Sequence, residues 1–185
     1  MEENLEPGER GDSGRAAALM EQGRQAERDG HEQHAFHCYA ESLALCRGLG
    51  NRAEIVRLLI RISYLSGWAD FGDGLDMFSR RARLAEEALP LARESGDAAL
   101  LAEALCAFSA GVFGEKSIAM LEESIQLARA CGARATQAAA MHRLALTLAL
   151  QRNHKRGRAL NHQALRLYQK LGDRKSTRLN SSHSS

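Results

Sequence analysis

The chain has 185 residues, 44% of them hydrophobic, and a formal net charge of +2, which suits one folded domain. This near-neutral balance gives no electrostatic argument for DNA, RNA or an anionic membrane as a partner. The longest apolar stretch, residues 98–114, contains Glu103 and is shorter than the about 20 residues that a membrane span needs. We therefore expect a cytoplasmic protein without a membrane segment.

Residues 1–13 are polar and include Pro7, Gly8 and Gly11, so we expect them to be disordered. After them, an amphipathic run that ends in glycine recurs four times, at Gly50, Gly96, Gly132 and Gly172. A left-handed glycine is a common end of a helix, and self-similarity at about 34–47 residues is typical of helical repeats. The pattern predicts four repeats, at about 14–50, 51–96, 97–132 and 133–172.

Each repeat carries a small residue in the same place of its first helical segment: Gly23, Ser63, Ser109 and Ala145. A small side chain there lets a second helix approach closely. The second segment has apolar residues at helical spacing, which predicts an antiparallel partner helix. In the first and fourth copies its expected inner residues are Ala35, Tyr39, Leu43 and Leu45, then Gly157, Asn161, Leu165 and Leu167.

This pattern resembles the tetratricopeptide repeat over roughly residues 14–172. The resemblance rests on the small column, on Ala35, Ala88 and Ala164 of the second helices, and on the Asp29–Gly30 turn. It implies an all-α, right-handed α-solenoid of about four antiparallel helix pairs. The chain departs from the family in lacking its first-helix tryptophan and in placing Arg81 where a small residue is expected.

The second repeat has extra residues near 67–74, which are rich in glycine and aspartate and predict a loop. Its second helix contains Pro90, which we expect to bend or break it.

Residues 173–185 read DRKSTRLNSSHSS. Codons for the first eleven of these residues can be written so that they match a short-read sequencing adapter. We therefore expect a non-native, disordered tail and a natural protein that continues past Gly172.

Chemical motifs are sparse. His31, His34 and Cys38 form the best candidate for a metal site, but two ligands on one helix need two more from elsewhere, and exposed helix histidines are the plainer interpretation. The four cysteines lack a CxxC spacing, which favours reduced thiols. We expect no catalytic residue and no cofactor, and we disfavour an enzyme that would work through His31–Cys38.

The resemblance implies a peptide-binding groove lined by the first helices. Its candidate residues are Met20, Arg24, Ile60, Arg61, Tyr64, Cys106, Ala110, His142, Arg143 and Leu146. The set is mostly apolar with a few arginines, which predicts an apolar or amphipathic peptide that offers carboxylates to the arginines. A basic run in the fourth repeat, from Arg152 to Arg166, is either a solvated face or a contact for an acidic partner.

The sequence thus predicts a non-enzymatic interaction module or scaffold for a protein or peptide partner. The alternative is a regulatory segment of a larger transcriptional regulator or signalling ATPase. Self-association through an exposed terminal repeat also stays open.

Overall fold

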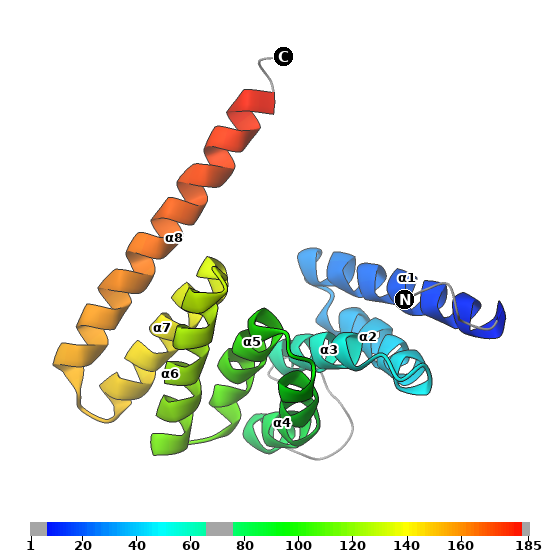
Figure 1. The fold of residues 1–185 in the computed structure, drawn as a ribbon, viewed down its shortest axis with the longest axis horizontal. Helices are drawn as coiled ribbons and strands as arrows, with labels where there is room; N and C mark the ends of the chain where they lie inside the picture. The colour runs from blue at the N-terminus through cyan, green and yellow to red at the C-terminus, as the bar shows by residue number, and fades with distance from the viewer. Residues whose placement is uncertain (1–6, 66–75, 183–185) are drawn as a thin grey trace.

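The computed structural model describes residues 7–65 and 76–182, and the regular elements within these ranges are all helices (Figure 1). The elements are α1 (Pro7–Arg28), α2 (Glu32–Gly48), α3 (Arg52–Leu65), α4 (Met77–Glu94), α5 (Ala98–Phe108), the 3₁₀ helix η1 (Ser109–Gly111), α6 (Glu115–Ala130), α7 (Arg134–Leu150) and α8 (His154–Ser182). The predicted all-α class is confirmed.

Each helix packs chiefly on the helices before and after it, from α1 at one end to α8 at the other (Figure 1). Each predicted repeat range contains one helix pair: α1 with α2, α3 with α4, α5 with α6, and α7 with α8. The first helices also touch one another directly, α3 on α5 and α5 on α7. The chain therefore stacks helix pairs in sequence order.

Three of the four predicted helix ends are confirmed. Gly50, Gly96 and Gly132 have φ values of 64°, 69° and 76°, in the left-handed region that favours glycine. After α2, the backbone N–H of Asn51 donates to the Cys46 carbonyl at 3.0 Å, and after α6 that of Ala133 donates to Ala128 at 2.8 Å. These bonds satisfy carbonyls that a helix end leaves free.

The fourth predicted end is wrong, because Gly172 lies inside α8. Glycine permits a left-handed turn but does not impose one. After the first three glycines a new helix follows and packs back on the pair, whereas the backbone after Gly172 continues as helix to Ser182. A glycine in a helix costs only about 1 kcal/mol relative to alanine, which does not end a helix by itself.

The predicted boundaries differ from the structure in three further places. First, α1 begins at Pro7 rather than at residue 14, and proline suits the first turn of a helix because its missing N–H would be unpaired there anyway. Second, α8 covers part of the tail expected to be disordered. Third, α4 runs unbroken through Pro90. Pro90 lies on the exposed side of the helix, so the carbonyl that its missing N–H leaves unpaired can bind water. The predicted loop at 67–74 lies outside the described residues.

The small column is buried in all four repeats, as predicted. Ser63, Ser109 and Ala145 are buried, and the two serine hydroxyls donate to carbonyls of their own helix, Ser63 to Ile60 at 2.7 Å and Ser109 to Cys106 at 2.8 Å. At Gly23 the partner helix comes so close that a Cβ atom would lie 2.4 Å from Cε1 of Tyr39. The helices of the first pair therefore approach each other closely at Gly23.

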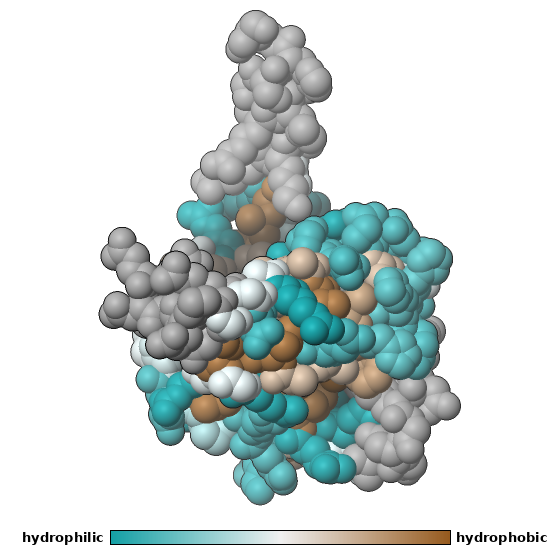
Figure 2. All heavy atoms as spheres, turned by 90° about the vertical axis from the view of Figure 1, so that its right-hand side faces the viewer, coloured by the Kyte–Doolittle hydropathy of each residue, from teal (hydrophilic) through white to brown (hydrophobic). Residues whose placement is uncertain are grey.

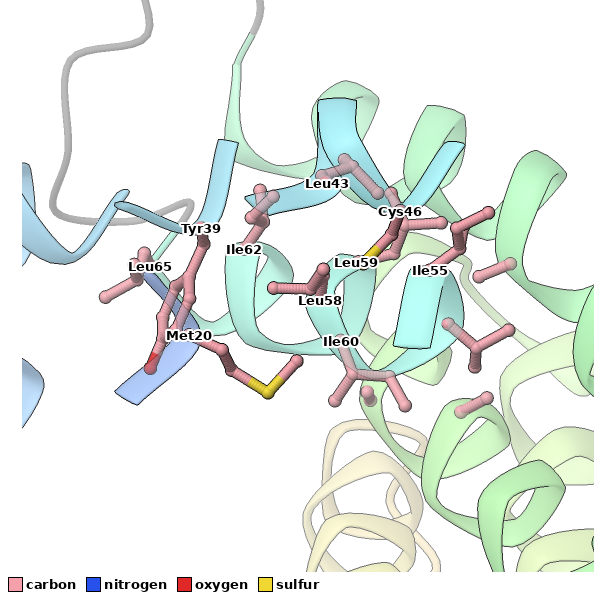
Figure 3. Packing of buried hydrophobic residues seen from close by; sticks show 14 of the residues in the cluster. Met20, Tyr39, Leu43, Cys46, Ile55, Leu58, Leu59, Ile60, Ile62 and Leu65 are labelled. Atoms are coloured by element: carbon pink, nitrogen blue, oxygen red, sulfur yellow. The ribbon is translucent and has the colours of Figure 1, made fainter. Parts of the chain in front are cut away.

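One apolar core joins the first two and a half repeats. Met20 of α1 and Tyr39, Leu43 and Cys46 of α2 lie against the apolar residues of α3, as Figure 3 shows. A second cluster joins the third and fourth repeats, with Cys106, Leu121, Leu144 and Leu148 at its centre. Arg81, at a position expected to be small, fits because its neighbour is Gly111 and because its Nε donates to the Ser63 carbonyl at 3.0 Å.

The tight contact at Gly23 makes a prediction for stability. Replacing Gly23 with alanine should lower the free energy of unfolding by about 1–3 kcal/mol, because the buried Tyr39 ring cannot move away. Gly14, in the same helix, has no atom within 4 Å of its added Cβ, so Gly14→Ala should raise stability by up to ~1 kcal/mol. Urea unfolding of both variants tests this, and equal effects would contradict it.

The cysteines make a second prediction. Cys131 is exposed, whereas Cys38, Cys46 and Cys106 are buried. We expect a thiol reagent to modify one cysteine per molecule quickly and the other three only after denaturant opens the fold. Cys131→Ser should remove the fast phase. A second fast thiol in the native protein would show that one of the helix pairs packs differently.

Candidate functional site: the first-helix surface

The first helices bring charged and aromatic side chains from distant parts of the sequence to one surface. Arg61 and Tyr64 come from α3 and Arg143 comes from α7, with α5 between these helices. The guanidinium carbon of Arg143 lies 5.8 Å from the centre of the Tyr64 ring, which is the geometry of a cation–π contact. We call Arg61, Tyr64 and Arg143 the first-helix surface.

The ten predicted groove residues divide by burial. Half-buried side chains are the largest group: Arg24, Arg61, Tyr64, Ala110 and Arg143. His142 and Leu146 are exposed. Met20, Ile60 and Cys106 are buried, so they support the surface from beneath and do not form it. Their burial could not be derived from spacing, because it depends on how closely the next first helix packs.

Two clefts adjoin predicted groove residues, one at each end of the stack. Met20 and Arg24 line a cleft of about 270 Å³ that also includes Glu21 and Glu54. Leu146 lines a second cleft of about 400 Å³ between α7 and α8. Seen from the α1–α2 side of the molecule, apolar side chains form a band bordered by hydrophilic ones (Figure 2). The available surfaces therefore combine apolar and charged groups.

At the α1 end of this surface, the buried Tyr39 and the half-buried Arg61 share the carboxylate of Glu27. The Tyr39 hydroxyl donates to Glu27 Oε2 at 2.7 Å, and Arg61 lies 3.4 Å from the same oxygen. Burial, together with this carboxylate, raises the pKa of Tyr39, so the hydroxyl stays a donor. Glu27 is not among the sequence-predicted site residues, because it lies twelve residues from Tyr39 and reaches it only once α1 and α2 pair.

Burial also shifts the pKa values of the groups around Arg143. It raises the pKa of Tyr64 to about 12 and that of the Cys106 thiol to about 11. Burial lowers the pKa of Arg81, and the positive charge of Arg143 adds to this effect. Tyr168 of α8 interacts electrostatically with Cys106 and Arg143 as well. Both guanidinium groups therefore lie in a partly desolvated place, where an incoming carboxylate would be held more strongly than in water.

The candidate metal residues do not converge. Cys38 Sγ lies 3.8 Å from His34 Nε2, and His31 precedes α2 as its N-cap residue. Within the described part of the chain, no three His, Cys, Asp or Glu side chains gather as a metal site would require. Burial raises the pKa of the Cys38 thiol, which disfavours the thiolate that would bind a metal.

The sequence also carries a charge asymmetry that the overall balance hides. Residues 124–172 contain nine lysines and arginines and no aspartate or glutamate. The basic run from Arg152 to Arg166, already evident in the sequence, is the densest part of this segment. From His154 to Gly172, the exposed basic side chains of α8 therefore have no acidic residue within the same stretch of helix.

Comparison with protein-family models and with curated proteins found no match to this chain. Among the described residues, no helix combines the length and apolar character required to cross a membrane.

The buried Cys106 predicts a loss of stability at alkaline pH. Its pKa rises from 9.0 to about 11 in the folded state, so between these values the folded protein keeps a proton that the unfolded chain loses. The free energy of unfolding should therefore fall by about 2–3 kcal/mol from this thiol as pH rises from 9 to 11. Cys106→Ala should flatten that dependence, and Cys131→Ala should not. Unfolding by urea at several pH values measures both slopes, and parallel slopes for the two variants would contradict the assignment.

Proposed function

We propose that this protein is a non-enzymatic interaction module of tetratricopeptide type, in which the helix pairs form a right-handed solenoid. Its first helices would line the concave face and bind an apolar or amphipathic peptide from a partner protein. The observation that carries this proposal is the Tyr64–Arg143 contact, which joins first helices of the second and fourth pairs across α5.

The chemistry of the first-helix surface indicates the kind of peptide. The Tyr64 ring and the neighbouring apolar residues offer contact area, while Arg61 and Arg143 are half-buried donors. Arg61 already shares Glu27 with Tyr39, whereas the Arg143 guanidinium lies over the face of the Tyr64 ring. A peptide carboxylate next to an apolar side chain would satisfy Arg143 with charge-assisted hydrogen bonds.

A peptide library displayed on phage tests this proposal. Selection on the purified protein should yield peptides that combine acidic and apolar residues. The double substitution Tyr64→Ala with Arg143→Ala should weaken a selected peptide by about tenfold or more, because it removes the ring and the guanidinium together.

Arg93→Ala is the matched control. It also removes one arginine, but from a second helix, where Arg93 pairs with Glu123 at 2.9 Å. Peptide affinity should not change in this variant. If the double variant bound every selected peptide as well as the unaltered protein, the groove assignment would be wrong.

A further inference from the structure

The end of the stack differs from its internal interfaces. Between the third and fourth pairs, Cys106 of α5 and Ile118, Leu121 and Ile125 of α6 pack against the apolar side of α7. These residues are apolar, and the contact buries Leu121 completely. This interface shows that the chain uses apolar side chains where the third helix pair packs on the fourth.

The same positions one repeat later carry different chemistry. The repeat register places His142, Arg158, Asn161 and Leu165 at the positions of Cys106, Ile118, Leu121 and Ile125. His142 Nδ1 and Asn161 Oδ1 are 2.8 Å apart, so the histidine donates to the amide oxygen. A purely apolar helix placed here would bury the Arg158 charge without a partner and would leave the remaining polar atoms of His142 and Asn161 unpaired, which is costly. The face is therefore not another repeat-stacking surface.

Apolar area remains beside these polar groups. Leu146, Leu165 and Tyr168 are 55%, 49% and 43% exposed. In the first three pairs the counterparts of Leu165 are Leu43, Leu89 and Ile125, which are buried or half-buried. The exposure of Leu165 contradicts its predicted place on the inner side of its helix, because no described helix follows α8 to cover it (Figure 1). We call His142, Leu146, Arg158, Asn161, Leu165 and Tyr168 the terminal face.

Charge decides which occupant fits the terminal face. It belongs to the segment of nine cations without a carboxylate, and Arg156 of that segment already pairs with Glu122 of α6. Arg158 lines the cleft between α7 and α8 and has no ion pair within the described side chains. A second copy of the chain would bring a second cationic face, which repels the first. A nucleic acid would leave Leu146 and Leu165 without apolar partners.

We infer that the terminal face binds an acidic amphipathic helix of a partner protein. Leucine-like side chains of this helix cover Leu146, Leu165 and Tyr168, and its carboxylates reach Arg158. The polar His142–Asn161 pair, whose asparagine lies between Arg158 and Leu165 along α8, orients the helix. The terminal face includes the predicted groove residues His142 and Leu146, but it does not use Arg61, Tyr64 or Arg143 of the first-helix surface, so the inference does not rest on the proposed function.

Two synthetic helical peptides test the inference by fluorescence anisotropy with the full chain. Both carry leucines along one face, but one has glutamates on the flanks and the other has lysines. The acidic peptide should bind about tenfold more tightly than the basic one. Leu165→Asp should weaken the acidic peptide by about tenfold, and Arg158→Glu should both weaken it and improve binding of the lysine peptide.

Arg166→Glu provides the control for net charge. Arg166 also belongs to α8 but lines another cleft, together with Met141, Gln163 and Lys170, so this variant should keep most of the affinity. Tyr64→Ala should leave binding unchanged, which separates this site from the first-helix surface. Circular dichroism confirms that each variant keeps its helices.

Several results would overturn the inference. Equal affinity for the two peptides, or an equal loss in Arg158→Glu and Arg166→Glu, would mean that overall charge alone attracts the peptide. A dimer in sedimentation that Leu165→Asp abolishes would assign the face to a second copy. Binding of a DNA duplex that requires Arg158 but tolerates Leu165→Asp would assign it to nucleic acid.

Discussion

The two helices of the first pair approach each other at Gly23, where the Tyr39 ring occupies the space that any larger side chain would need. The same position holds serine or alanine in the other pairs and is buried in each. This limit on side-chain size fixes the distance within a pair. That distance places the apolar side of each pair against the next one, so the sequential stacking of eight described helices depends on it.

Stacking the pairs also decides which charged residues become partly desolvated. Arg61, Arg81 and Arg143 are all half-buried, and they come from three different helices. Each has found a compensating contact: a carboxylate, a backbone carbonyl and an aromatic ring, respectively. A surface of this kind is suited to recognition, since guanidinium groups in a region of low dielectric bind carboxylates with strength and directional preference.

The two ends of the stack are chemically different. The last 49 residues before position 173 carry only positive charges, and the acidic residues of the helix pairs before them lie at or before Glu123. At the last pair, polar residues replace the apolar ones that join the third pair to the fourth, while leucine and tyrosine remain exposed beside them. This combination is compatible with a partner that is both apolar and acidic.

Local patterns in the sequence determined the helix pairs, the left-handed turns at Gly50, Gly96 and Gly132, and the buried small column, because all of these depend on residues close in the chain. They could not determine the end of α8, since a glycine ends a helix only where a following segment packs back. The burial of Ile60 and Cys106, the contact between Tyr64 and Arg143 and the exposure of Leu165 were decided by tertiary structure alone. The physical reason is that these properties belong to the space between helix pairs, which forms only when residues up to about 80 positions apart are brought together by packing.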